Sequence, residues 1–227
     1  EFDACGVPHE MVITGTHRAD EDRLKGDLQK ICEAQIRFFG EPAPMDRYLF
    51  LTMALGGYGG LEHRASTSLL CSRESLPQRH EAHTLSDKYK TFLGLCSHEY
   101  FHTWNVKRIR PASFTPYDLS TEGYTTLLWA FEGITSYYDD LILHRCGLID
   151  TSAYLGLLSK TASRVYKGEG RKKQSLADSS FYAWTKFYRQ DENAPNAIVS
   201  YYAKGALVAL ALDLHIRIET NGRCTLD

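Results

Sequence analysis

The pattern of apolar and polar residues predicts strands in the first third of the chain. Residues 9–15 have the length of a short strand closed by glycine, and the continuous apolar run 48–55 fits a second one. Between them, residues 20–39 predict a helix, because Leu24, Leu28 and Ile31 recur at the spacing of one helical face. A glycine and two nearby prolines end this helix, and a glycine-rich turn at 56–60 follows the second strand.

The remainder of the chain is predicted to be mostly helical. Ser86 is a suitable N-cap for a helix that runs to about residue 104. Further helices are expected at 126–145, 152–166 and 202–219, whereas the polar stretch 167–196 is expected to be mostly loop. Because the strands come early and the helices late, the pattern predicts an α+β fold, with a short N-terminal β-sheet followed by a mostly helical part.

The composition limits the class of protein but does not indicate a reaction. The 227 residues are 43% hydrophobic and 24% charged, as in an ordinary globular protein. A formal net charge of −2 excludes a strongly basic surface field, so we expect no nucleic-acid partner. No apolar run approaches the roughly 20 residues that span a bilayer, so we expect no membrane partner either.

Six cysteines are spread along the chain without a C-x-x-C pair. Disulfide scaffolds are short and rich in cysteine, so we expect free thiols in a reducing compartment and a cytoplasmic protein. The sequence lacks an initiator methionine and stops just after an Asn-Gly that ends a helix. We therefore expect this chain to be a piece of a longer protein.

The sequence His98-Glu99-Tyr100-Phe101-His102 carries the clearest chemical signal. Two histidines four residues apart on a helix project from one face, where both imidazoles can bind one Zn²⁺ ion. Glu99 lies beside that face without being a ligand and can act as the general base toward a water activated by the metal. The motif therefore predicts a zinc-dependent peptidase, against the alternative of two surface histidines on an amphipathic helix.

A catalytic zinc ion takes a third protein ligand and keeps one position open. Glu132 lies on the next predicted helix, among the apolar residues 127–131. A carboxylate in apolar surroundings needs a compensating partner, and a zinc ion supplies one. Glu132 is therefore the candidate third ligand, with a solvent-facing glutamate as the alternative.

Two segments of the sequence together resemble one family. They are HEYFHTWNVKRIRP at 98–111 and WAFEGITSYY at 129–138, and both resemble the glycyl aminopeptidase family of gluzincin metallopeptidases. The resemblance implies a thermolysin-like catalytic domain over residues 1–227, with Glu132 as the third zinc ligand. It also implies a β-rich domain before this part and a PDZ domain after it in full-length members, neither of which lies in this sequence.

The segment GGLEH at 59–63 resembles the Gly-x-Met-Glu-Asn segment of the broader aminopeptidase group. That resemblance implies that Gly59 and Gly60 lie along the substrate and that Glu62 binds its free amino terminus through a charge-assisted hydrogen bond. Here leucine replaces methionine and His63 replaces asparagine. The alternative is a glutamate of a glycine-rich turn in solvent.

A fourth segment, Tyr202-Ala203-Lys204-Gly205, resembles a Tyr-x-Lys-Gly element of related aminopeptidases. The resemblance implies that the Tyr202 hydroxyl stabilises the oxyanion of the tetrahedral intermediate. Tyr201 is adjacent, and the sequence does not choose securely between the two, although the spacing to the Lys-Gly pair favours Tyr202. A core or surface tyrosine is the alternative.

One feature of thermolysin-like endopeptidases is missing. Four residues after the ligand glutamate they carry an aspartate that orients a zinc histidine, and this sequence has Ser136 at that position. Another residue must then support the histidines, and Ser136, Asp139 and Asp140 are the candidates.

The sequence thus predicts a zinc aminopeptidase that cleaves after small N-terminal residues such as glycine. Its expected partners are a peptide substrate with a free N-terminus and the flanking domains of the full-length chain. A zinc endopeptidase shares the same metal machinery and is the first alternative. A catalytically idle metallopeptidase fold that serves as an interaction module is the second.

Overall fold

The computed structural model describes residues 1–79 and 85–227 of the chain. These residues divide into two compact units, each assembled from two stretches of sequence. Unit 1 comprises Glu1–Arg108 with Asp139–Thr151, and unit 2 comprises Ile109–Tyr138 with Ser152–Asp227. All the strands in the described ranges belong to unit 1, so the predicted α+β class, with early strands and late helices, is confirmed.

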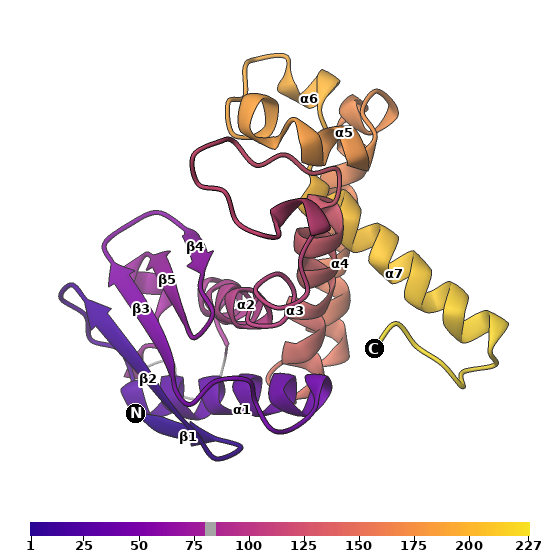
Figure 1. Cartoon of the computed structure of the whole chain (residues 1–227). Helices are drawn as coiled ribbons and strands as arrows, with labels where there is room; N and C mark the ends of the chain where they lie inside the picture. The colour runs from indigo at the N-terminus through magenta and orange to yellow at the C-terminus, as the bar shows by residue number, and fades with distance from the viewer. Residues whose placement is uncertain (80–84) are drawn as a thin grey trace. The chain divides into compact units, whose positions relative to one another are not determined.

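Unit 1 is built on a five-stranded mixed sheet (Figure 1). Its strands are β1 (Phe2–Ala4), β2 (Val7–Thr14), β3 (Tyr48–Ala54), β4 (Gly59–Glu62) and β5 (Ser66–Cys71). The order across the sheet is β1-β2-β3-β5-β4, with parallel pairing of β2, β3 and β5 and antiparallel pairing of both edge strands. The predicted strands correspond to β2 and β3, whereas β1, β4 and β5 were not predicted.

The apolar run that predicted β3 contributes to both faces of the sheet. Tyr48 and Phe50 are fully buried on the inner face, whereas Leu51 and Met53 on the outer face are 43% and 49% exposed. Side chains alternate across a strand, so an unbroken apolar run does not require burial on both faces. The helices of unit 1 therefore pack on the face that carries Tyr48 and Phe50.

Two long helices and one shorter element complete the first stretch of unit 1. They are α1 (Glu21–Phe39), α2 (Asp87–Phe101) and η1 (Arg73–Ser75). The Asp20 and Ser86 side chains cap α1 and α2 by accepting backbone N–H groups, as predicted for Ser86. The Gln35 amide of α1 donates to the Ser97 carbonyl of α2 at 2.8 Å, and this buried bond joins the two helices.

An internal hydrogen bond attaches α2 to the sheet. His9 Nε2 of β2 lies 2.9 Å from the Tyr100 hydroxyl of α2, and both side chains are buried. The Tyr100 ring also packs edge-on against Tyr48 of β3, with ring centroids 4.7 Å apart. These contacts fix the rotation of α2 about its axis, and with it the direction in which the residues next to Tyr100 point.

Unit 2 is helical and irregular in the part of the chain that the structure describes. Its elements are η3 (Ala112–Phe114), η4 (Trp129–Gly133), the first turns of α3 (Ile134–Arg145), α4 (Thr151–Lys167, from Ser152 on), η5 (Glu169–Lys172), α5 (Leu176–Phe181), η6 (Ala183–Phe187), α6 (Ala194–Ala197) and α7 (Tyr201–Glu219). The division between the units falls inside α3, between Tyr138 and Asp139. The helices predicted at 152–166 and 202–219 are confirmed as α4 and α7.

Two predictions for unit 2 require correction. The helix expected from residue 126 begins at Trp129, and its first element, η4, is a single π-helical turn. The stretch 167–196, expected to be mostly loop, contains four short helical elements. Local signals mark two of them: Ser175 accepts the Asp178 backbone N–H at the start of α5, and Pro195 lies in the first turn of α6. Elements this short show no apolar periodicity.

All six cysteines, each within the described ranges, are free thiols. Burial raises the pKa of the Cys32 and Cys96 thiols well above the ordinary value, so these two groups stay protonated at neutral pH. The free thiols agree with the prediction from cysteine spacing. The cytoplasmic location itself stays a prediction.

One stretch of unit 2 is long and apolar enough to cross a membrane by length and composition alone. It is Ala194–Glu219, with a mean hydropathy of 1.4 over its most apolar window, of which 39% is buried. The core helix of a globular domain meets the same criterion. The expectation of no membrane partner therefore stays a prediction.

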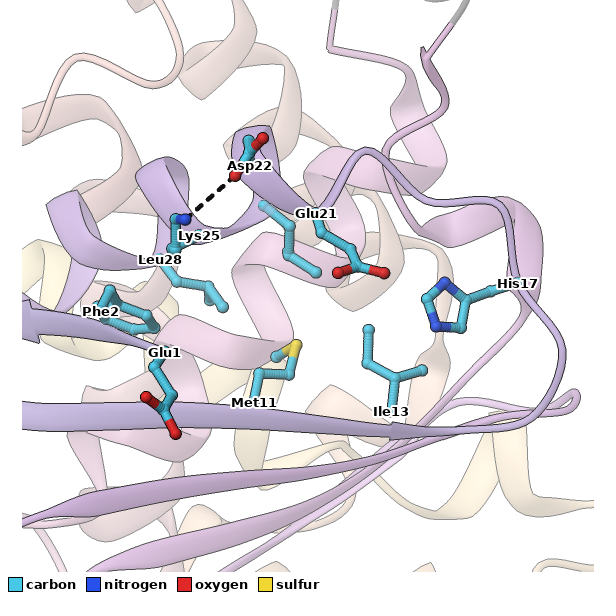
Figure 2. A pocket seen from close by; sticks show the side chains of 10 residues that line it. Glu1, Phe2, Met11, Ile13, His17, Glu21, Asp22, Lys25 and Leu28 are labelled. Atoms are coloured by element: carbon cyan, nitrogen blue, oxygen red, sulfur yellow. Dashed lines mark hydrogen bonds and ion pairs between the residues drawn. The ribbon is translucent and has the colours of Figure 1, made fainter.

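A cavity of about 330 Å³ lies between β2 and α1 in unit 1 (Figure 2). Apolar side chains form much of its lining, including Met11 of β2 and Leu28 of α1. Lys25 and Asp22, which form an ion pair at 3.1 Å, also line it. Among the described residues of its lining, none belongs to the predicted site.

Candidate metal centre

The last turn of α2 brings the two predicted histidine ligands together. His98 and His102 have ring centroids 4.7 Å apart at an interplanar angle of 84°, and one ring nitrogen of each lies within 4.8 Å of the other. His102 is 1% exposed, and the His98 side chain is 12% exposed. The two imidazoles therefore form a close, largely buried pair on one face of the helix.

Hydrogen bonds fix which nitrogen of each ring is available. His102 Nδ1 lies 2.7 Å from the Asn105 backbone carbonyl, which can only accept, so Nδ1 carries the proton. His98 Nδ1 lies 3.0 Å from Asp139 Oδ2 and donates to this carboxylate in the same way. Both Nε2 atoms are thereby left as lone-pair donors, which is the arrangement of metal-binding histidines. The chemistry of this donor set fits a zinc ion.

Asp139 of α3 is the residue that supports His98. It was one of the three candidates from the sequence, and its carboxylate accepts the hydrogen bond from His98 Nδ1 at 3.0 Å. Burial raises the pKa of Asp139, and the hydrogen bond and charge of His98 partly oppose that rise. The aspartate thus takes its position from the packing of α3 against α2.

Glu99 lies in the core of unit 1, 5% exposed, against strand β4. A Cβ atom at Gly60 would overlap the Glu99 carboxylate and lie 2.5 Å from its Cγ. Gly60 is therefore required for the carboxylate to occupy this place. By contrast, no described heavy atom lies within 4 Å of a Cβ at Gly59.

The Glu62 side chain, at the end of β4, lies close to Glu99 and His102. Oxygens of Glu62 and Glu99 and a ring nitrogen of His102 lie within 4.8 Å of one another. Lys107 Nζ lies 3.1 Å from Glu62 Oε1, and the two side chains are 20% and 19% exposed. The backbone N–H of Lys107 donates to the His102 carbonyl at 3.1 Å. Glu62 is thus a paired residue beside the histidines on a strand, not a turn glutamate in solvent.

In unit 2, Glu132 lies on the π-helical turn η4, which packs closely on the start of α7. A Cβ at Gly133 would lie 2.6 Å from the Gly205 Cα, and a Cβ at Gly205 would lie 2.9 Å from both the Gly133 Cα and the Trp129 carbonyl oxygen. Only glycine at both positions allows this approach. The segment that contains Glu132 and the segment that contains Tyr202 therefore meet at their glycines.

Tyr202 faces the charge of Glu132. Burial and this charge, in that order, raise the pKa of Tyr202, so its phenol stays protonated and can donate a hydrogen bond. Burial also raises the pKa of Tyr201, which is 1% exposed, and its hydrogen bond to Tyr188 and the charge of Glu132 add to that rise. Both phenols therefore stay protonated at neutral pH.

Sequence reasoning missed a third tyrosine of this cluster. The Tyr188 hydroxyl lies 3.0 Å from the Tyr202 hydroxyl, and the Tyr201 hydroxyl donates to it at 3.2 Å. Tyr188 follows η6, within the stretch that was expected to be loop, and no motif surrounds it. Only the folded chain places it next to α7.

Units 1 and 2 therefore contain different residues of the predicted site. Unit 1 carries the two histidines with Glu99, Glu62, Gly59 and Gly60, and unit 2 carries Glu132 with Tyr202. The role of Glu132 as third ligand, and the catalytic and substrate-binding roles of the others, stay predictions.

Comparison with known proteins shows similarity to one protein family and to solved structures. The family model of M61 glycyl aminopeptidase matches residues 91–208, which is more than half of the chain. The crystal structure of an aminopeptidase N family protein from Idiomarina loihiensis has a TM-score of 0.96 and 56% sequence identity, covering 99% of this chain and 38% of that one. This chain thus spans well under half of that protein. No curated protein matches.

Proposed function

This chain belongs to the M61 glycyl aminopeptidase family, and we propose that it is the catalytic part of a zinc-dependent aminopeptidase that removes small N-terminal residues such as glycine. The observation that carries the proposal is the pair His98 and His102, each with Nδ1 bonded and Nε2 available, beside the buried Glu99. Membership of the family supports peptidase activity, and the activity, the metal and the specificity all belong to the proposal.

The proposed metal ligands are His98, His102 and Glu132. The matched region of the family model contains all three, which supports a common role. When bound, zinc supplies a Lewis acid that makes water nucleophilic at neutral pH. Asp139 and the Asn105 carbonyl keep the two imidazoles in the tautomer that binds a cation.

Glu99 is the proposed general base. It takes a proton from the attacking water and then delivers it to the leaving amine of the cleaved bond. Its position in a nearly water-free environment strengthens its electrostatic interaction with the reacting groups. Gly60 gives the carboxylate room, so this glycine contributes to catalysis by the space it leaves.

Glu62 is the proposed anchor for the substrate's α-ammonium group, with Gly59 and Gly60 along the bound peptide. Its proximity to Glu99 and His102 supports this role, because an exopeptidase must hold the amino terminus close to the reacting carbonyl. The ion pair with Lys107 shows that the Glu62 carboxylate already accepts from one ammonium group. A second oxygen remains for another.

Tyr202 is the proposed oxyanion donor. Its spacing to the Lys204-Gly205 pair and its partial exposure support the choice over Tyr201, which is fully buried. The natural partners of the whole enzyme, namely a peptide with a free N-terminus and the flanking domains, belong to the same proposal.

The test combines metal analysis with a substrate screen on the full-length enzyme. We expect one zinc ion per site and hydrolysis of glycyl and alanyl substrates only when the α-amine is free. Equal cleavage of acetylated peptides would remove Glu62 from amine recognition and favour the endopeptidase. Bound zinc without hydrolysis across free and blocked peptides would favour an idle interaction module.

A further inference from the structure

We propose that Tyr188 is a positioning residue that orients the Tyr202 hydroxyl and strengthens it as a hydrogen-bond donor. The inference rests on the proposed function of Tyr202 as oxyanion donor. It concerns a residue outside the metal site, on a segment that no motif marks. Tyr188, Tyr201 and Tyr202 all lie in unit 2.

Three phenol hydroxyls form a connected row. Tyr201 donates to Tyr188 at 3.2 Å, and the Tyr188 and Tyr202 hydroxyls are 3.0 Å apart. Tyr201 is fully buried at the start of α7, and Tyr188 gives its hydroxyl an acceptor there. The first donor of the row is therefore the buried Tyr201 hydroxyl.

The number of protons sets the direction of the second bond during the reaction. A phenol has one proton to donate, and its oxygen can accept. Once the Tyr202 proton is directed at an oxyanion, the 3.0 Å contact can persist only if Tyr188 donates to the Tyr202 oxygen. No proton changes its heavy atom in this step; the hydrogen bonds only take one direction, from Tyr201 through Tyr188 to Tyr202.

When the hydrogen bonds of the row all run from Tyr201 toward Tyr202, the Tyr202 hydroxyl becomes a stronger hydrogen-bond donor. A hydroxyl that accepts a hydrogen bond is polarised and donates more strongly, and the effect adds along a chain. Tyr188 thus strengthens the proposed oxyanion donor through the hydrogen bond that it donates to the Tyr202 oxygen.

Aromatic packing holds the row in place. The Tyr201 and Tyr202 rings stack with centroids 4.6 Å apart, and the Phe187 ring contacts both, at 4.9 and 5.8 Å. The Tyr188 backbone N–H donates to the Ala183 carbonyl at 3.0 Å. Because Tyr188 is 56% exposed, loss of its hydroxyl leaves this packing intact.

The test is Tyr188→Phe in the full-length, zinc-loaded enzyme with a free-amine glycyl substrate. We expect kcat to fall about 3–10-fold with KM unchanged, because a strengthened donor is lost but the oxyanion contact remains. Affinity for a phosphinic peptide analogue of the tetrahedral intermediate should fall by the same factor. Affinity for a non-hydrolysable ground-state peptide should not change, whereas a general packing defect would lower both.

Tyr166→Phe is the matched control, because this tyrosine of unit 2 is 69% exposed and lies on α4. It should match the wild type. Tyr202→Phe separates the two proposals: a large loss there with unchanged kcat in Tyr188→Phe overturns the role of Tyr188 alone. Full activity of Tyr202→Phe overturns the proposed oxyanion donor, and the inference with it.

Discussion

The two units present their parts of the predicted site in different ways. In unit 1 the functional groups lie on a regular helix and on strand β4, and hydrogen bonds fix each histidine ring, as with the His102 bond to Asn105. In unit 2 they lie on a π-helical turn and on the first turn of α7, joined by a contact between two glycines and by hydrogen-bonded phenols. Substitutions in unit 1 should therefore affect the chemistry and metal affinity first, and those in unit 2, apart from the proposed ligand Glu132, the strength of a donor or the stability.

The largest effect is expected for Glu99→Gln in unit 1. The amide cannot take a proton, so kcat should fall by about 10²–10⁴-fold, the range for a lost general base. The metal ligands are untouched, so zinc content measured by atomic absorption should equal that of the wild type. Wild-type turnover in the zinc-loaded variant would exclude Glu99 as the base.

Gly60→Ala should follow, with a loss of kcat on the order of 10²-fold, because its Cβ displaces the Glu99 carboxylate. Gly56→Ala is its matched control: in the turn before β4, its Cβ meets no described atom within 4 Å, so activity should change little. Kinetics of both variants with one glycyl substrate measure the difference. Equal losses would mean that the backbone of this region, rather than the space beside Glu99, is the sensitive feature.

Asp139→Ala removes the acceptor that fixes the His98 ring. Loss of such a supporting residue lowers metal affinity by about 10–100-fold. Competition with a chelator measures the affinity, and excess zinc should restore most of the activity. A variant that stays inactive at saturating zinc would show that Asp139 acts on more than the metal.

Gly133→Ala tests the contact that orders unit 2. Its Cβ would lie 2.6 Å from the Gly205 Cα, and backbone atoms cannot move aside as a side chain can. We expect a loss of about 1–3 kcal/mol in the free energy of unfolding, as for other overpacked sites. Chemical denaturation measures this loss, and Gly156→Ala on α4, where the added Cβ meets no described atom, is the control.

Lys107→Met should have the smallest effect. Without the ammonium group, the Glu62 carboxylate keeps its full attraction for a substrate α-ammonium, so KM for free-amine substrates should fall about 2–5-fold. Acetylated inhibitors should bind as before. A higher KM would instead show that Lys107 holds Glu62 in its binding position.

The sequence predicted the regular elements with strong apolar spacing and clear caps, namely α1, α2, α4, α7 and the central strands. It did not predict β5, since Ser66–Cys71 has three small polar residues followed by two leucines and a cysteine, without alternation, over only six positions. It also did not predict β4, because two glycines at its start indicate a turn. The second of them, Gly60, is in close approach to Glu99, which only tertiary structure shows.

The candidate site was predictable where one motif contains all its members, as in the histidine pair. Support for His98 could not be assigned from sequence, because Ser136, Asp139 and Asp140 are close in sequence and the packing of α3 on α2 decides among them. Tyr188 gave no signal at all. Its part depends on a hydroxyl contact with α7, and a lone tyrosine in a polar stretch has no spacing that indicates such a contact.

The contact between Gly133 and Gly205 has a consequence for how this sequence can change over time. Each glycine belongs to a different motif, yet each is needed because of the other, since a methyl group on either one meets backbone of the opposite segment. The two positions are therefore physically coupled. A larger side chain at either glycine costs stability unless the opposite segment moves away at the crossing of η4 and α7.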